Sequence, residues 1–278
     1  MNHSASPLPI VVGVDGSKHG VRAAMWAIDE AVSRDTPLRL VHVVNARSAD
    51  PDRDYAYARD VLHKAWDAVE ATGQPVKLES DIQRGDPLDE LVKLSRTAAM
   101  MCVGSRGTNN SPRHRRGSTA AELAQRAHSP VGIVRRRHTH KPPPAGQWII
   151  AALDESPGSH AVLQTALHEA QLRQGSVLAL TPWPTVTVDA GPPGDEPGLV
   201  MKLKRYLNDA QDDNADVEVC TLPMPTDMSN LLAQSASIDQ LVVVGPSDPD
   251  LITQVVGPKA RAILHKTNCS LLFLRDRR

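Results

Sequence analysis

The sequence lacks the features of a secreted protein, of a membrane-spanning protein and of a protein with a structural metal site. Its three cysteines, Cys102, Cys220 and Cys269, are odd in number and lie far apart in apolar runs, which favours reduced packing thiols over disulfides, zinc binding or redox chemistry. No apolar run approaches the roughly 18 residues of a membrane span. The N-terminal MNHSASPLP also lacks the basic and apolar regions of a signal peptide. We therefore expect a cytoplasmic protein with no membrane partner.

Aromatic residues and net charge are also scarce. With four Trp, three Tyr and one Phe, the core must be built mainly from aliphatic side chains. A formal net charge of -1 gives no general attraction to nucleic acid, so we expect no nucleic-acid partner. The length of 278 residues favours about two domains.

An internal repeat determines the predicted organisation. The segment VVGVDGSKHGVRAAMWAIDEA, 11–31, matches IAALDESPGSHAVLQTALHEA, 150–170, at a register of 139 residues. Asp15, Ser17 and Glu30 fall on identical residues in the second copy, and LAQRAHSPVGIVRR matches ILHKTNCSLLFLRD near the other end. We predict domains at 1–139 and 147–278, joined by a proline-rich linker at 140–146.

Each copy alternates short apolar runs with helical patterns. In the first copy, PIVVGVD, LRLVHVV, VKLESDI, AMMCVG and PVGIVR read as strands. Between them we expect helices from Ser17 to about Ser33, 54–71 and 86–97, with a T-x-x-E capping box starting the last helix at Thr119. The second copy repeats the plan with WIIAALD, SVLALTP, DVEVCTL, QLVVVG and SLLFLR. The predicted fold is α/β: two tandem Rossmann-like domains, each a five-stranded, mostly parallel sheet flanked by helices.

The stretch VGSRGTNNSPRHRRGST, 103–119, carries three glycines in the spacing G-x2-G-x9-G-[ST]. Gly104 ends a predicted strand, Gly107 would let the chain turn outward through positive φ, and Gly117 with Ser118 precedes a helix. Unpaired N–H groups and the positive dipole end favour phosphate at a helix N-terminus. The loop also carries the cations Arg113, Arg115 and Arg116. The spacing predicts an anion site, although a solvated glycine-rich surface loop would have the same composition.

Two further residues fall at the carboxyl ends of predicted strands, where open α/β sheets bind their ligands. Asp15 follows the first strand and Val43 lies near the end of the second. Asp15 is a candidate ligand-binding carboxylate, and the alternative is a helix-capping carboxylate.

The five-stranded plan, the VGVDGS opening, the HV of the second strand and the glycine motif resemble the ATP-binding branch of the universal stress proteins. The tandem arrangement is similar to that of actinobacterial, mycobacterium-like members of this family. The resemblance implies ATP and Mg²⁺ as ligands, with Asp15 beside the ribose and metal, the backbone of Val43 at the adenine, and the glycine loop at the phosphates and ribose. The implied nucleotide-binding residues are Gly13, Asp15, Val43, Gly104, Ser105, Arg106, Gly107, Gly117, Ser118 and Thr119.

The second copy departs from this motif. Ser247 or Asp248 stands where the middle glycine is expected, and Pro258 replaces the serine after the last glycine. Proline removes one backbone N–H, and the aspartates of this loop repel phosphate. Pro182 takes the place of Val43. We interpret the second copy as a degenerate domain kept for packing, dimerisation or regulation.

Three function classes compete. The first is an ATP-dependent regulator of stress adaptation, growth control or dormancy, the function that the resemblance implies. The second is a slow ATPase or autophosphorylating enzyme, for which the sequence supplies no evident general base beyond Asp15. The third, an adenylating enzyme or electron-transfer flavoprotein, is disfavoured because VDGSKHG lacks a serine-glycine-glycine pyrophosphate loop. We predict no catalytic residue, a homodimer or intramolecular domain pairing through the fifth strands, and an unidentified regulatory partner.

Overall fold

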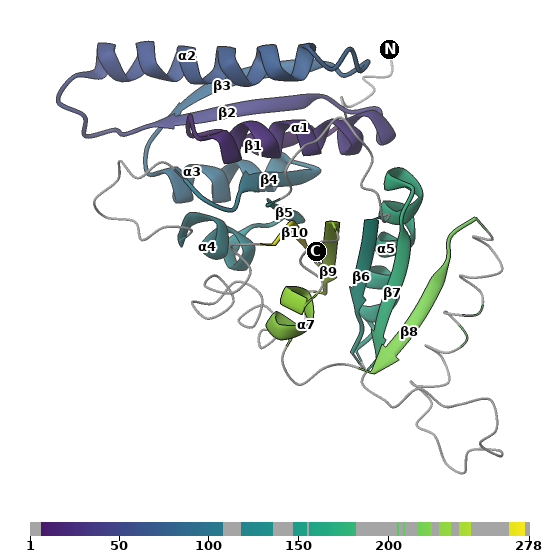
Figure 1. Ribbon diagram of the computed structural model, residues 1–278. Coiled ribbons are helices and arrows are strands. Elements are labelled where there is room, and N and C mark those ends of the chain that lie inside the picture. Colours follow the sequence, from purple (N-terminus) through teal and green to yellow (C-terminus); the bar gives the residue numbers. More distant parts are fainter. Residues whose placement is uncertain are drawn as a thin grey trace, which may run out of the picture. The chain divides into compact units, whose positions relative to one another are not determined.

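The computed structural model describes residues 7–107, 118–135, 147–154, 156–181, 205, 208, 216–223, 228–234, 239–245 and 267–275. The chain divides into two compact units, residues 1–138 and 139–276. Each unit alternates strands with helices around a parallel sheet, which confirms the predicted fold class (Figure 1). The predicted linker, 140–146, lies outside the described residues.

The first unit has five parallel strands in the order β3-β2-β1-β4-β5. Gly13 is in register with Val41 on one side and with Val103 on the other, so the carboxyl ends of β2, β1 and β4 are neighbours. In chain order the elements are β1 (Ile10–Gly13), α1 (Lys18–Ser33), β2 (Leu38–Val44), α2 (Pro51–Glu70), β3 (Leu78–Arg84), α3 (Pro87–Leu94), a 3-10 turn (Ser95–Thr97), β4 (Met100–Gly104), α4 (Ser118–Arg126) and β5 (Val131–Val134).

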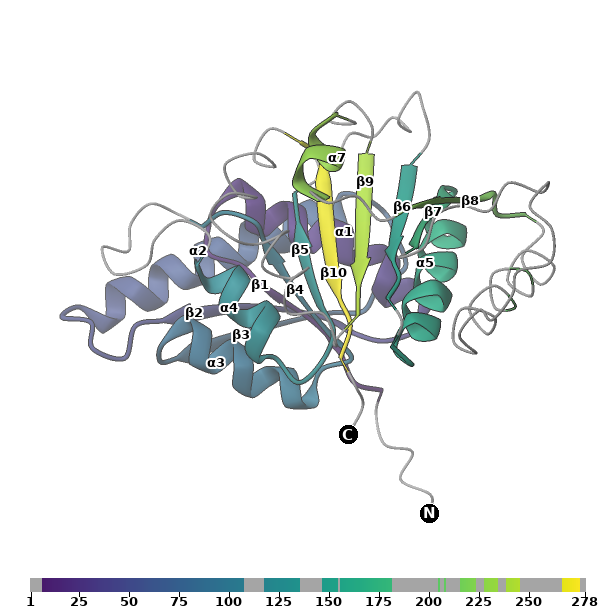
Figure 2. The same cartoon turned by 90° about the horizontal axis from the view of Figure 1, so that it is seen from below.

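Helices cover the sheet of the first unit on both faces. The helices α1 and α2 pack on each other and against the strands, while α3 packs with α4. Figure 2 shows α3 and α4 on one side of these strands and α1 on the other. The largest fully buried side chains here are aliphatic or sulfur-containing, as expected from the scarcity of aromatics: Ile10, Leu38, Leu40, Met101, Leu123 and Ile133.

Short polar signals set the helix starts. Ser17 accepts hydrogen bonds from the backbone N–H groups of His19 and Gly20, which confirms the predicted cap of α1. The predicted Asp-Pro start of α3 is also confirmed, since the side chain of Asp86 accepts from two N–H groups of the first turn. The same signal, Asp50-Pro51, starts α2 three residues earlier than predicted, because Asp50 accepts from the N–H of Arg53.

Two further predicted helix boundaries differ from the structure. The helix α4 begins at Ser118, so Thr119 lies inside its first turn and is not the cap of a T-x-x-E box. The third helix is α-helical only to Leu94, and the remaining residues to Thr97 form a 3-10 turn. Helix ends often tighten in this way because their last carbonyl groups have no α-helical donor.

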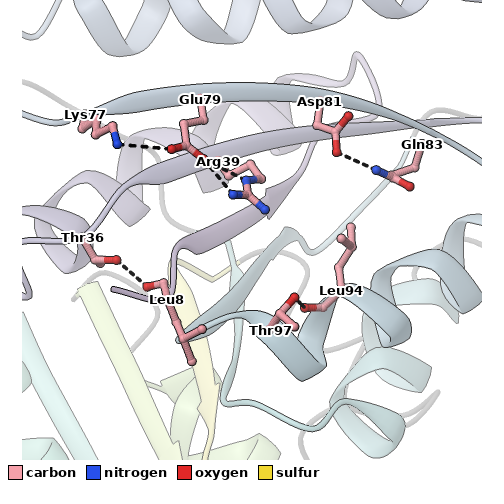
Figure 3. A network of polar contacts seen from close by, with 9 residues as sticks. All are labelled: Leu8, Thr36, Arg39, Lys77, Glu79, Asp81, Gln83, Leu94 and Thr97. Carbon is pink, nitrogen blue, oxygen red and sulfur yellow. Dashed lines mark hydrogen bonds and ion pairs between the residues drawn. The ribbon is translucent and has the colours of Figure 1, made fainter. Parts of the chain in front are cut away.

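The edge of the sheet is held by a polar cluster between β2 and β3 (Figure 3). Arg39 of β2 donates two hydrogen bonds, of 3.0 and 2.9 Å, to Glu79 of β3, and Lys77 lies 3.5 Å from the same carboxylate. The hydrogen bonds from Arg39 lower the pKa of Glu79, so this carboxylate stays ionised and paired at neutral pH. The pair bridges β2, the strand that carries Val43, and β3, which are joined by their parallel backbone pairing.

The described part of the second unit repeats this plan with five parallel strands in the order β10-β9-β6-β7-β8. An ion pair with a buried carboxylate recurs at equivalent repeat positions: Glu30 of α1 pairs with half-buried Arg34, which directly follows the helix, and Glu169 pairs with the buried side chain of Arg173 in α5. The described elements of the second unit are β6 (Gln147–Ala152), α5 (Ser159–Arg173), β7 (Ser176–Thr181), β8 (Val219–Pro223), α7 (Met228–Gln234), β9 (Asp239–Val244) and β10 (Cys269–Phe273).

The cysteines are thiols, as expected. Cys102 and Cys269 are buried and Cys220 is half-buried, and none of the three forms a disulfide. Among the described helices, none has the length and apolar character needed to cross a membrane.

Candidate functional site

The strand order gathers the predicted site residues of the first unit. Because β1 lies between β2 and β4, the segments that follow these strands emerge side by side at their carboxyl ends. Asp15 lies two residues beyond the end of β1, half-buried Val43 lies near the end of β2, and Gly104 ends β4. This is the edge of the sheet at which open α/β folds bind ligands.

Asp15 is the centre of this arrangement. Its carboxylate accepts a hydrogen bond of 3.0 Å from the backbone N–H of Ser17, which turns the chain into α1. A Cβ placed on Gly107 would lie 2.9 Å from the other oxygen, Oδ2. The loop after β4 therefore passes directly beside the carboxylate, and it can do so because residue 107 has no side chain.

The same loop is fixed to the start of α1. A Cβ on Gly104 would lie 2.6 Å from the backbone carbonyl carbon of His19, so only glycine allows this approach of β4 to α1. The hydroxyl of Ser17 donates to the carbonyl of Arg106 at 3.3 Å. The loop after β4 is thus held against α1 by the close approach at Gly104 and by the hydrogen bond from Ser17 to the backbone of Arg106.

The expected positive φ at Gly107 is wrong. Among the described residues, the glycines with positive φ are Gly16 and Gly73, and Gly16, with φ of 84°, lies at the site. The left-handed turn is thus made in the loop after β1, directly beside Asp15. Gly104 and Gly107 are instead glycines for steric reasons, because backbone or carboxylate atoms occupy the space of a Cβ.

Positive charge surrounds the first turn of α1. His19 is half-buried, and its Nδ1 is buried without a hydrogen-bond partner among the described residues. Burial, followed by the nearby charges of Arg22, Arg106 and Lys18, lowers the pKa of His19, while the charge of Asp15 acts in the opposite direction. Cations and the N-terminal dipole of α1 together favour an anion beside this turn.

The remaining predicted residues differ in their surroundings. Gly13 faces the core, since a Cβ there would lie 3.3 Å from Leu91 of α3, so its small size serves packing. Ser105 donates its N–H to the carbonyl of Val134 at 3.1 Å, and Thr119 lies half-buried in the first turn of α4. Ser118 begins α4, whereas Gly117 and the three arginines before it lie outside the described residues.

The structure adds two residues beside the site, Tyr57 and His42, of which His42 belongs to the HV of the second strand but was given no role by the sequence patterns. His42 is buried and donates from Nδ1 to the carbonyl of Val14 at 2.7 Å, which ties the end of β2 to the end of β1. Tyr57 of α2 meets the His42 ring edge to face, with ring centroids 5.9 Å apart. Tyr57 does not belong to the buried face of α2, so helical periodicity gave no signal for it; that face is formed by Ala58, Val61, Leu62, Ala65 and Val69.

The equivalent carboxylate in the second unit accepts hydrogen bonds from two hydroxyl groups at one of its oxygens, Oδ1. Asp154 accepts hydrogen bonds from the Ser156 hydroxyl and the Ser159 hydroxyl, each at 2.6 Å, and from the Ser156 N–H at 2.9 Å. Burial raises the pKa of Asp154, but these hydrogen bonds outweigh it, so the pKa is lowered overall. In the first unit the position equivalent to Ser159 is Gly20, which has no hydroxyl to offer.

A separate hollow of about 600 Å³ lies between α2 and β3, away from the strand ends that form the candidate site. Within it, Nδ1 of His63 lies 3.5 Å from a carboxylate oxygen of Asp67. Its lining residues are Arg59, Leu62, His63, Trp66, Asp67, Glu70, Ser80, Asp81 and Ile82. None of them belongs to the predicted nucleotide-binding set.

Comparison with known proteins identifies both units. The model of the universal stress protein family matches residues 8–135 and 147–275. Two universal stress proteins of Mycobacterium tuberculosis are 38% identical over 269 residues and 36% identical over 283 residues, with at least 96% of each chain covered. The crystal structure of a universal stress protein from Archaeoglobus fulgidus DSM 4304 shares the fold, with a TM-score of 0.65, 17% identity and 96% coverage of both chains.

Proposed function

Since this chain belongs to the universal stress protein family, with two such domains and a role in stress response, we propose that its first unit binds ATP with Mg²⁺ and that the bound nucleotide regulates the protein. The bound and empty forms would differ in the partner that they engage. In this proposal the nucleotide is a ligand that sets the state of the protein, and it is not a rapidly consumed substrate.

The observation that carries the proposal is the approach of the β4 loop to Asp15. Gly107 adds no side chain beside the Asp15 carboxylate, and Ser17 fixes the loop through the carbonyl of Arg106. The backbone and the carboxylate therefore meet at the carboxyl ends of β1 and β4, beside the positively charged first turn of α1. A polyphosphate suits the positive turn, and a ribose hydroxyl or a metal ion suits the carboxylate.

The residues fit a magnesium ion that arrives with the nucleotide. The described residues contain no cluster of three or more histidine, cysteine or carboxylate side chains that could hold a metal by themselves. Mg²⁺ in nucleotide sites is often held by one or two carboxylates together with substrate phosphates. We assign Asp15 as the protein ligand, and the ion would supply neutralisation of phosphate charge.

We propose that the second unit does not bind ATP. One oxygen of Asp154, Oδ1, already accepts short hydrogen bonds from the hydroxyls of Ser156 and Ser159, and displacing them would oppose ligand binding. Its glycine motif is also degraded in sequence, at positions outside the described residues. A packing or regulatory role is what remains for this unit.

The proposal is tested on the full chain. Protein purified without added nucleotide is denatured, and the released nucleotides are separated and quantified. Titration of nucleotide-free protein with Mg-ATP should then give one site per chain, and saturation at about 100 times the Kd should stabilise the binding unit by roughly 2.7 kcal/mol. The Gly117→Glu variant places a negative side chain in the phosphate motif. It should lose both the binding seen by titration and the stabilisation by Mg-ATP. Unchanged melting of the wild type in millimolar Mg-ATP would contradict the proposal.

A further inference from the structure

Tyr57 is an exposed aromatic residue beside the candidate site to which the proposed function gives no role. Its side chain is 47% exposed, and it is one of four large apolar residues that stand out on the described surface. A single exposed tyrosine on a helix is ordinary by itself. Its contacts are what connect it to the site.

The first contact is with the loop that carries Asp15. A Cβ on Gly16 would lie 2.5 Å from the Tyr57 hydroxyl oxygen and 3.0 Å from a methyl group of Val61. The phenol can therefore close over the backbone of Gly16 because this residue lacks a side chain and has a φ of 84°. The tyrosine hydroxyl thus lies one residue away from the proposed ribose and metal ligand.

The second contact is with the end of β2. The Tyr57 ring meets the His42 ring at an interplanar angle of 75°, and His42 is held in place by its hydrogen bond to Val14. His42 directly precedes Val43, the residue assigned to the adenine. Tyr57 consequently contacts both the loop after β1, which would hold the ribose, and the end of β2, which would hold the base.

The strand order separates Tyr57 from the phosphate side. The loop that carries Arg106 and Gly107 comes from β4, on one side of β1, whereas Tyr57 rests against β2, on the other side. Asp15 lies between them, at the end of β1. If the phosphates lie on the β4 side, the nucleoside extends toward β2 and reaches the exposed tyrosine ring.

We propose that Tyr57 is the aromatic wall of the nucleoside half of the site and that it sets the preference for a nucleotide over a bare polyphosphate. This inference rests on the proposed ATP site and adds a specificity residue to it. Aromatic rings stack on bases of any identity, and removal of such a ring weakens binding by roughly 5- to 150-fold per base. The wall should therefore select for the presence of a base more strongly than for adenine itself.

The test compares Tyr57→Ala, Tyr57→Leu and Tyr57→Phe with the wild-type full chain. The ligands are Mg-ATP and inorganic tripolyphosphate with Mg²⁺, and affinity is measured by titration calorimetry and by the ligand-dependent shift in melting temperature. Tyr55→Ala is the matched control, because residues two apart on a helix do not share a face. Leucine keeps side-chain bulk without an aromatic face, so it separates stacking from simple packing.

We expect Tyr57→Ala and Tyr57→Leu to bind ATP at least about fivefold more weakly, with unchanged tripolyphosphate affinity, whereas Tyr57→Phe and Tyr55→Ala stay within about twofold of wild type. Wild-type ATP affinity in Tyr57→Ala would overturn the inference and leave the ATP site standing. An equal loss for both ligands would assign Tyr57 to loop structure and also overturn it. If wild-type protein binds no ATP, the proposed function fails together with this inference.

Discussion

The hydroxyl of Ser159 donates a hydrogen bond of 2.6 Å to the carboxylate of Asp154, and the residue equivalent to Ser159 in the first unit is Gly20. A Cβ placed on Gly20 would lie 3.2 Å from Asp15 Oδ1, so a larger residue there would crowd this carboxylate. The two aspartates occupy the same position in the repeat and differ in what surrounds them. This difference makes each of them a control for the other.

We expect Asp15→Asn to weaken Mg-ATP binding about tenfold or more and Asp154→Asn to leave it unchanged. Asparagine keeps the shape of the side chain but removes the charge that would hold Mg²⁺. In the second unit the same change weakens the hydrogen bonds at the start of α5 and should cost about 1 kcal/mol of stability. Calorimetric titration of both full-length variants gives the affinities. Equal losses of affinity would show that the second unit also contributes a site.

The glycines of the β4 loop should separate stability from binding. In Gly104→Ala the new Cβ would meet the rigid backbone of His19, so the unfolding free energy should fall by about 1–3 kcal/mol. In Gly107→Ala the new Cβ meets only the Asp15 carboxylate, at an exposed position, so the fold should persist while ATP affinity falls. Urea unfolding and ATP titration of both variants provide the comparison. A stable Gly104→Ala protein would disprove the steric role of this glycine.

His19 should make the stability of the ligand-free protein sensitive to mildly acidic pH. Burial and the neighbouring cations lower its folded-state pKa below the ordinary value of 6.5. A histidine with a lowered folded-state pKa contributes stability above pH 6.5, and this contribution is lost as the pH falls through the folded-state pKa. The His19→Gln variant should therefore show a smaller loss of unfolding free energy between pH 7.5 and about pH 5. Parallel pH profiles for the two proteins would rule out this contribution.

Hydrolysis of bound ATP should be far slower than the roughly 1 to 100 per second of protein kinases. Fast phosphoryl transfer needs a positioned nucleophile and charge stabilisation aimed at the transferred group, whereas Asp15 is the one carboxylate in the proposed nucleotide-binding set. Release of ADP is measured for the wild type and for Gly117→Glu. A contaminating ATPase would be unaffected by the substitution. A rate in the kinase range that disappears in the variant would make the nucleotide a substrate.

The sequence by itself determined the plan of this protein. The 139-residue repeat, the alternation of apolar runs with helical patterns, and the Asp-Pro and serine caps are local signals, and local sequence sets strands, helix starts and their order. The glycine spacing and VGVDGS opening pointed to the first unit as the ligand-binding one. The exact start of α4 and the end of α3 were not predictable in this way, because several residues near a helix end satisfy the same backbone groups.

Only the tertiary structure decided what each site residue contacts. The need for glycine at 104 and 107 comes from His19 and Asp15, about ninety positions earlier in the chain, and the left-handed turn lies at Gly16 instead. Tyr57 became part of the site through its approach to Gly16 and His42, which helical periodicity does not encode. Such contacts arise when parallel strands bring loops that are distant in sequence to one edge of the sheet. The spacing of residues in the sequence does not predict which side chains then lie close together.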